Sequence, residues 1–212
     1  MATPLQRIVN GAPPAAWEKC WAERLTPWDL GGVTPLIQHL VSQDQLPQGR
    51  CLVPGCGSGY DVLALASPSR HVVGLDISET ALERAKELAS KNTTTQKYVE
   101  FKAVDFFSYS EPKPFDLIFD YTFFCALEPS LRPAWAKKMA ELLARDGELL
   151  TLMYPVGDHE GGPPYAASPK AYEAVLHPCG LHALYLEDNK FSIGARKGRE
   201  ILGRWKKTTP RI

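Results

Sequence analysis

The chain has 212 residues, and its 24 lysine and arginine residues balance 24 aspartate and glutamate residues. This length predicts one domain over residues 1–212 with a substantial core. A chain without net charge has no long-range attraction for nucleic acid or anionic lipid, and no apolar run approaches the roughly 18 residues of a membrane span. We therefore expect neither nucleic acid nor membrane as a partner.

The first fourteen residues, MATPLQRIVNGAPP, contain neither a signal peptide nor a transit pattern. The five cysteines include no C-x-x-C pair, and Cys51 and Cys56 are isolated from histidines, which predicts buried or free thiols in a reducing compartment and no metal site. We therefore expect a cytoplasmic protein, and we expect it to be a monomer.

Tryptophans cluster ahead of the first predicted strand. Trp17, Trp21 and Trp28 lie within a dozen residues, and the first two are one helical turn apart. Such a stripe is more often a helix packing its aromatic side against a sheet. The alternative is a lid, within residues 1–35, that excludes water and presents aromatic faces to a cationic sulfonium.

The most informative segment reads CLVPGCGSG. It predicts a short buried strand, Cys51–Pro54, and then a turn with three glycines, namely Gly55, Gly57 and Gly59. Glycines allow a ligand to approach the backbone more closely than any Cβ would permit. The next predicted strand, His71–Asp76, ends in a carboxylate that is placed to accept hydrogen bonds from a ribose diol.

The glycine spacing indicates which cofactor is bound. The dinucleotide fingerprint is G-x-G-x-x-G, and here Tyr60 stands where its third glycine belongs. A phosphate-binding P-loop is excluded because no lysine follows the glycines. A glycine turn without phosphate-binding groups, followed by Asp76, suits S-adenosylmethionine, a nucleoside with a sulfonium amino acid and no phosphate.

Strands and helical segments alternate along the rest of the chain. The further strands are predicted at Tyr98–Val104, Phe115–Tyr121, Glu148–Tyr154 and His182–Leu186, with a last one within Phe191–Lys206. This alternation predicts an α/β fold with a mostly parallel sheet, helices on both faces and ligands at the carboxyl ends of the strands.

Helix ends are also recognisable. Ser78 is the predicted N-cap of the helix after the second strand, and Thr80 with Glu83 has the spacing of a capping box. Gly147 is expected to end a later amphipathic helix. Ser168 before a proline is expected to start a short one.

Side chains at the strand ends are the candidate ligands. Asp105 is placed to accept from an adenine amine, with Phe106 as a flat face for the ring; the alternative is a loop aspartate beside core phenylalanines. Asp120 ends the fourth strand, where the methionine end of the cofactor is expected, and Asp116 is its structural alternative. Tyr154 ends the fifth strand, either to orient an acceptor or to pack there.

Six segments together resemble the thiopurine methyltransferase superfamily, and within it the plant thiol methyltransferases, also called thiocyanate or halide methyltransferases. They are WEKCWAERLTPWDLGGVTP, LVPGCGSGYDV, GLDIS, DFF, FDLIFDYTFFCAL and GELLTLMYPV. The resemblance runs from about Trp17 to Lys206 and implies a class I, Rossmann-like sheet of seven strands whose last strand is antiparallel. It implies a tyrosine beside the acceptor at Tyr154. The implied cofactor contacts are Trp17, Trp21, Trp28, Gly55, Asp76, Asp105, Phe106 and Asp120.

The resemblance implies S-adenosylmethionine-dependent methylation of small soft anions, such as iodide, bromide, chloride, thiocyanate or bisulfide. The alternative acceptors are bulkier thiols, such as aryl thiols or thiopurines. An acceptor that is already anionic has no proton to lose, which agrees with the lack of histidine and cysteine at the predicted strand ends. Phe123 or Phe124 is expected to wall the acceptor site. The candidates to attract the anion are Arg196, Arg199 and Arg204, although exposed arginines are usually solvated.

Three other functions compete. A nucleic-acid amino-methyltransferase would need an Asn or Asp-Pro-Pro-aromatic motif, where this chain reads Asp120-Tyr-Thr-Phe. A nicotinamide-dependent reductase would need the third fingerprint glycine and a catalytic tyrosine–lysine pair. A non-catalytic module that binds the cofactor remains the third alternative.

Overall fold

A computed structural model describes residue 8 and residues 13–207. The described residues leave out most of the first fourteen residues, where no signal or transit peptide was expected. They also leave out the start of the predicted lid segment, residues 1–35. The chain divides into two compact units. The first contains the residues up to Gln45 together with Cys51–Tyr109, and the second contains Leu46–Arg50 together with the residues from Ser110 onward. Within residues 13–207, no helix is both long and apolar enough to cross a membrane.

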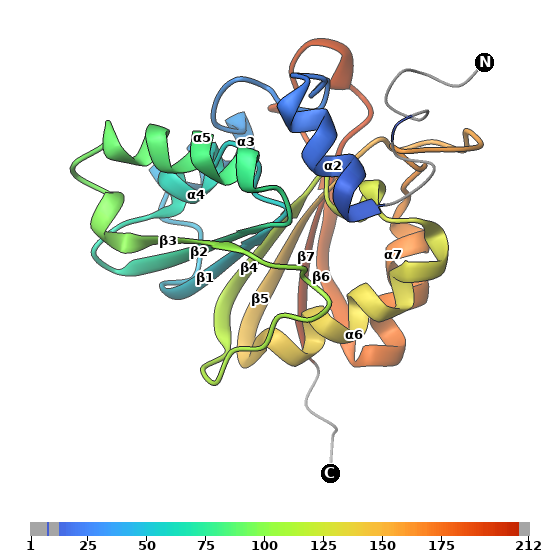
Figure 1. Cartoon of the computed structure of the whole chain (residues 1–212). Coiled ribbons are helices and arrows are strands. Elements are labelled where there is room, and N and C mark those ends of the chain that lie inside the picture. The colour runs from blue at the N-terminus through green and yellow to red at the C-terminus, as the bar shows by residue number, and fades with distance from the viewer. Residues whose placement is uncertain (1–7, 9–12, 208–212) are drawn as a thin grey trace. The chain divides into compact units, whose positions relative to one another are not determined.

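The described residues of the first unit form four α-helices and three strands, although the first two residues of β1, Gly49 and Arg50, belong to the second unit. The helices are α2 (Pro13–Ala22), α3 (Pro35–Ser42), α4 (Tyr60–Leu65) and α5 (Glu79–Ser90), and the strands are β1 (Gly49–Pro54), β2 (Arg70–Asp76) and β3 (Val99–Ala103). Strands β2 and β3 are parallel and pair from Val72 with Val99 to Asp76 with Ala103. Figure 1 shows α2 beside the N-terminal end of α5.

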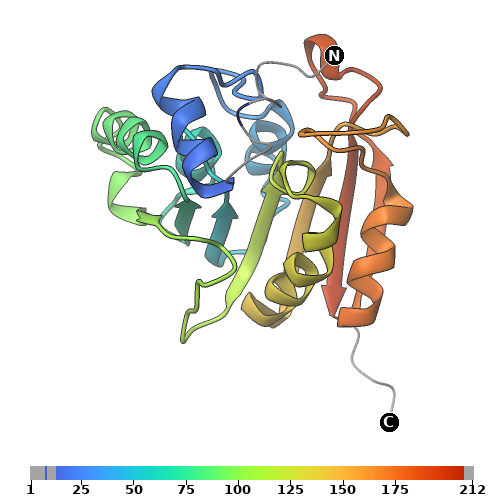
Figure 2. The same cartoon turned by 45° about the vertical axis from the view of Figure 1, so that its right-hand side comes forward.

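The second unit carries the remaining strands and two helices. They are β4 (Phe115–Tyr121), α6 (Arg132–Leu142), β5 (Leu143–Met153), α7 (Pro169–Leu176), β6 (Leu181–Asp188) and β7 (Ile201–Lys207). Strands β4 and β5 are parallel, whereas β7 is antiparallel to both β5 and β6. Helices α6 and α7 lie side by side against these strands (Figure 2).

The hydrogen-bonded strand order is β3-β2-β1-β4-β5-β7-β6. This confirms the predicted α/β class, the sheet of seven strands and the antiparallel last strand. The strands also lie close to the positions predicted from the alternation of strand and helix segments. The exception is β5, which begins at Leu143, five residues earlier than predicted.

Two helix caps are confirmed, and two expected helix signals are wrong. The hydroxyls of Ser78 and Ser168 each accept a hydrogen bond from the backbone N–H three residues later, at 3.1 Å. Gly147 does not end a helix but lies inside β5. Glycine is required at this position because a Cβ there would be 2.9 Å from the carbonyl oxygen of Phe115. Thr80 is not a cap either, since it is already the second residue of α5.

The core of the second unit is aromatic. Phe124 stacks on Tyr172 with ring centroids 3.9 Å apart and meets Trp135 edge-on at 4.7 Å. Tyr172 in turn stacks on Trp205 of β7 at 6.4 Å. All four side chains are almost fully buried. Aromatic ring contacts therefore pack α6 and α7 against the strands.

We expect Ser168→Ala to lower the free energy of unfolding by about 1 kcal/mol, because the first turn of α7 loses its side-chain cap. Urea unfolding measures this loss. Ser130→Ala, at an exposed position, is the control and should change it much less. Equal effects of the two variants would show that the cap contributes no stability.

Candidate functional site

Asp76 is the centre of the candidate cofactor site in the first unit. It lies at the end of β2 and is 9% exposed. Its Oδ2 accepts a hydrogen bond from the Gly57 N–H at 2.8 Å, and its Oδ1 accepts one from the Ser78 N–H at 3.0 Å. Burial raises the pKa of this carboxyl, and the backbone hydrogen bonds oppose that rise. Each oxygen keeps a further lone pair, so the carboxylate is still able to accept the two ribose hydroxyls.

The glycine turn is left-handed at all three glycines, with φ of 60° at Gly55, 51° at Gly57 and 74° at Gly59. A Cβ on Gly57 would lie 2.9 Å from the indole of Trp21. Gly57 is therefore required by a neighbouring side chain as well as by backbone conformation. Gly55 is exposed, and it remains the predicted glycine contact of the cofactor.

The three tryptophans form one cluster. The ring of Trp28 meets Trp17 at 5.4 Å and Trp21 at 6.0 Å, edge-on in both cases. Trp21 is only 3% exposed and carries the Arg84 guanidinium 5.2 Å from its ring. Trp21 thus anchors the helix, as the packing alternative held. Trp17 and Trp28 are half-buried, so they keep ring surface for a ligand, and contact with the cofactor remains a prediction for all three.

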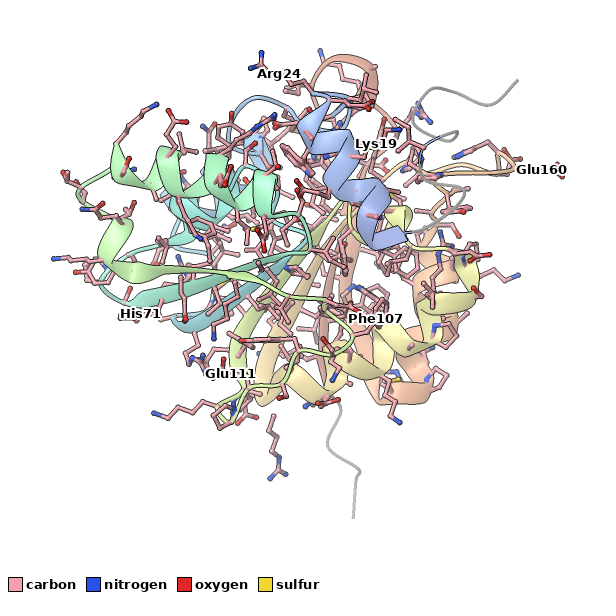
Figure 3. All side chains as sticks on the ribbon, viewed as in Figure 1. Lys19, Arg24, His71, Phe107, Glu111 and Glu160 are labelled. Carbon is pink, nitrogen blue, oxygen red and sulfur yellow. The ribbon has the colours of Figure 1, made fainter. Side chains whose placement is uncertain are left out.

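Asp105 and Phe106 are less clearly placed for a ligand. The exposed Asp105 accepts a hydrogen bond from the Phe107 N–H at 3.0 Å, which is a local turn. Phe106 is 4% exposed, so little of its ring is left for an adenine. Phe107, labelled in Figure 3, is half-buried. Its ring meets Phe106 edge-on, with ring centroids 5.4 Å apart. The adenine contacts at Asp105 and Phe106 stay predictions, and Phe107 is the neighbouring ring with more open surface.

Asp120 is fully buried at the end of β4. Its Oδ2 accepts from the Trp135 indole N–H at 2.9 Å, and its Oδ1 accepts from the Phe124 N–H at 3.2 Å. Burial raises the pKa of this carboxyl to about 7. The side chain therefore shapes the turn after β4, and its predicted cofactor contact stays untested. Asp116 accepts from the Arg50 N–H at 2.8 Å, the structural role foreseen for it.

Tyr154 follows β5 and is half-buried beside two positive charges. The guanidinium of Arg196 lies 4.7 Å from its ring centroid, and that of Arg199 lies 5.7 Å away. In the described part of the chain, no group forms a hydrogen bond with the Tyr154 hydroxyl. A tyrosine with a free hydroxyl and two neighbouring cations is suited to holding an anion.

A buried polar network holds Arg196 in place. Arg196, 6% exposed, donates to the Tyr121 hydroxyl, and Tyr121 donates to the Glu200 carboxylate. Glu200 also accepts from Asn189 at 2.8 Å and from Ser192 at 2.6 Å. Burial raises the pKa of Tyr121, so its hydroxyl remains protonated. Neither Tyr121, which directly follows Asp120, nor Glu200 was predicted from the sequence, and Glu200 carries no local sequence signal.

The other residues considered for the acceptor site have structural roles. Arg204 forms an ion pair with Glu148 of β5, and Phe124 belongs to the aromatic core, which leaves Phe123 as the candidate wall. Burial raises the pKa of the Cys125 thiol to about 12, so it is neutral and unreactive. Between residues 13 and 207, no group of three or more His, Cys, Asp or Glu side chains is arranged to hold a metal ion.

A family model described as thiopurine S-methyltransferase matches residues 12–206. The chain belongs to the thiopurine S-methyltransferase family. It is accordingly an S-adenosylmethionine-dependent methyltransferase, and the glycine turn and the Asp76 carboxylate fit a nucleoside without phosphates. The family and the cofactor predicted from the sequence are thereby confirmed.

Relatives within the family are close. Thiocyanate methyltransferase 1 of Brassica oleracea is 59% identical over 191 residues, which cover 90% of this chain and 84% of the relative. Thiocyanate methyltransferase 1 of Arabidopsis thaliana is 58% identical over 207 residues, covering 98% and 89%.

Solved structures support the fold alone. A 1,6-didemethyltoxoflavin-N1-methyltransferase from Burkholderia thailandensis, with bound S-adenosylhomocysteine, aligns with a TM-score of 0.75 at 14% identity over 99% of this chain and 92% of that one. A magnesium protoporphyrin IX methyltransferase from Synechocystis aligns with a TM-score of 0.63 at 15% identity over 98% and 86%.

We expect Gly57→Ala to weaken binding of S-adenosylhomocysteine by about ten-fold, because the new Cβ displaces Trp21 from the glycine turn. Isothermal titration calorimetry measures the Kd. Gly31→Ala is the matched control, since Gly31 has a φ of 69° but no atom near its Cβ position. Similar Kd values for the two variants would mean that backbone strain, rather than Trp21, requires the glycine.

We expect the wild type to lose stability relative to Asp120→Asn as the pH rises from about 4 to about 7. Over that range the unfolded chain releases the Asp120 proton, whereas the folded chain retains it, so rising pH favours unfolding by up to about 1.4 kcal/mol per pH unit. Urea unfolding without cofactor at several pH values measures the difference. Asp146→Asn, at an exposed position, is the control. A pH-independent difference between wild type and Asp120→Asn would show that Asp120 is ionised in the folded state.

Proposed function

We propose that this chain transfers the methyl group of S-adenosylmethionine to small soft anions, with thiocyanate as the leading acceptor and bisulfide and the heavier halides as others. The observation that carries the proposal is the Tyr154 hydroxyl, which has no hydrogen-bond partner among residues 13–207, beside the guanidinium groups of Arg196 and Arg199. The products are methyl thiocyanate, methanethiol and methyl halides.

The relatives support this choice of acceptor. Two proteins of 58–59% identity are named thiocyanate methyltransferases. An Arabidopsis thaliana relative named probable thiol methyltransferase 2 is 54% identical over 203 residues, which cover 96% of this chain and 89% of the relative.

The chemistry asks little of the protein in the way of proton transfer. S-adenosylmethionine supplies an electrophilic methyl group on a sulfonium, and an anion that displaces it has no proton to lose. A general base is therefore unnecessary, which is consistent with the neutral thiol of Cys125 and the protonated Tyr121. What remains for the residues is alignment of the reactants and exclusion of water, which together contribute up to about 7–11 kcal/mol in favourable cases.

The charges around Tyr154 suit a weakly hydrated monovalent anion. Arg196 attracts the anion, while the nearby Glu200 carboxylate, connected through Tyr121, offsets part of that positive charge. The Tyr154 hydroxyl is then the donor that orients the anion. A partly balanced site of this kind holds the acceptor without binding it so tightly that turnover suffers.

Bulkier thiols are the alternative acceptors, because the family is described by its thiopurine S-methylation. A thiol must first lose its proton to react. Tyr154 or water would have to assist, since Cys125 and Tyr121 both hold their protons. The acceptor assay below distinguishes the two classes.

We expect Tyr154→Phe to lower kcat/KM for thiocyanate by about 10–100-fold, because the anion loses one charge-assisted hydrogen bond. Headspace gas chromatography of parallel vials with S-adenosylmethionine and thiocyanate, iodide, bromide, chloride or bisulfide measures turnover. The Kd of S-adenosylhomocysteine should not change.

The control for this prediction is Tyr185→Phe, at an exposed tyrosine of β6, which should turn over at the wild-type rate. Unchanged turnover of every anion by Tyr154→Phe would place the acceptor elsewhere. Methylation of aryl thiols without any volatile product would favour the alternative acceptors.

A further inference from the structure

Glu18 is the residue through which α2 reaches the N-terminus of α5. Its Oε2 accepts hydrogen bonds from the Ser78 hydroxyl at 2.6 Å and from the Thr80 N–H at 3.3 Å, and its Oε1 accepts from the Thr80 hydroxyl. These bonds, led by the one from Ser78, lower the pKa of the Glu18 carboxyl. The first turn of a helix also stabilises a negative charge. The carboxylate is therefore ionised and bound at three donors.

These bonds close a ring of contacts around the cofactor residues. Ser78, which donates to Glu18 through its hydroxyl, donates to Asp76 through its N–H. Asp76 accepts from Gly57 on its other oxygen, and the Trp21 indole lies against Gly57. Trp21 follows Glu18 on the same helix by three residues. Displacing any one member therefore loosens the others.

A second acidic residue, Glu23, directly follows α2 and serves as a comparison. Among residues 13–207 its ion pair is with Lys19, at 3.7 Å, on an exposed surface. Exposed pairs of this kind contribute little stability. The chain thus offers two glutamates five positions apart, of which only Glu18 joins α2 to α5.

We propose that Glu18 is a positioning residue. Its hydrogen bonds with Ser78 and Thr80, here called the clasp, hold the tryptophan helix α2 against the S-adenosylmethionine site and so determine how tightly the cofactor is bound. When the clasp is broken, α2 leaves the glycine turn and the tryptophans no longer cover the cofactor, while Asp76 keeps its own backbone hydrogen bonds. The inference depends on the cofactor and not on the acceptor. Its test contains no acceptor, so its outcome is separate from that of the proposed function.

The test is the Kd of S-adenosylhomocysteine, measured by isothermal titration calorimetry on the full chain. Glu18→Gln keeps the shape of the side chain but removes its charge, and we expect the Kd to rise about ten-fold. Glu23→Gln is the matched control and should leave the Kd unchanged. Thr80→Val removes one donor of the clasp, so we expect a smaller rise and a non-additive effect when it is combined with Glu18→Gln.

Limited trypsin digestion provides a second measurement. Arg24 is exposed just after α2, and its side chain projects away from the helix (Figure 3). We expect cleavage after Arg24 to be faster in Glu18→Gln than in the wild type, with weaker protection by S-adenosylhomocysteine. Glu23→Gln should be cleaved and protected like the wild type.

Two results would overturn the proposal. One is an unchanged Kd and cleavage rate in Glu18→Gln, even if its free energy of unfolding falls, since a merely structural role predicts that pattern. The other is an equal rise in Kd for Glu18→Gln and Glu23→Gln. If Glu18→Gln does not fold, Thr80→Val decides, because its Kd must exceed that of the wild type if the clasp exists.

Discussion

Two backbone N–H groups on the Asp76 carboxylate organise the predicted cofactor site of the first unit. A buried carboxylate without donors would cost several kcal/mol, so the chain must bring Gly57 and Ser78 to it. The left-handed backbone at Gly57 turns one N–H toward the carboxylate and leaves room for Trp21. Ser78 supplies the other N–H and, through its hydroxyl, the link to Glu18. The glycine turn, the tryptophan helix and α5 are thus positioned around one side chain.

Three aspartates near strand ends show how burial and donors assign different roles to the same residue type. Asp76 accepts from two backbone N–H groups and is still 9% exposed, so it remains the candidate to bind a ligand. Asp120 is enclosed by the Trp135 indole and the aromatic core, and its raised pKa reflects that enclosure. Asp116 holds the backbone of Arg50. Both Asp76 and Asp120 were predicted cofactor contacts, and in the folded chain Asp120 is fully buried whereas Asp76 is 9% exposed.

The proposed acceptor site in the second unit depends on charge balance rather than on acid–base catalysis. Arg196 is buried beside the rings of Tyr121 and Tyr154. The Glu200 carboxylate, which accepts a hydrogen bond from Tyr121, compensates the positive charge of Arg196. A general base would have no proton to remove from an acceptor that is already an anion. Donors and a moderate positive potential are what a soft anion needs, and these are the features that the second unit provides around Tyr154.

The sequence by itself determined the strand alternation, the glycine turn, the caps at Ser78 and Ser168 and the acidic end of β2. These features depend on periodicity, on φ preferences and on hydrogen bonds that span a few residues, all of which are local. The tertiary structure alone decided the roles of Glu18, whose partner Ser78 is 60 residues away, and of Glu200, whose partner Tyr121 is 79 residues away. It also decided that Gly147 lies in a strand, at a position where the backbone of β4 leaves no space for a side chain. Contacts over such separations leave no mark in local patterns, since only the folded chain brings the partners together.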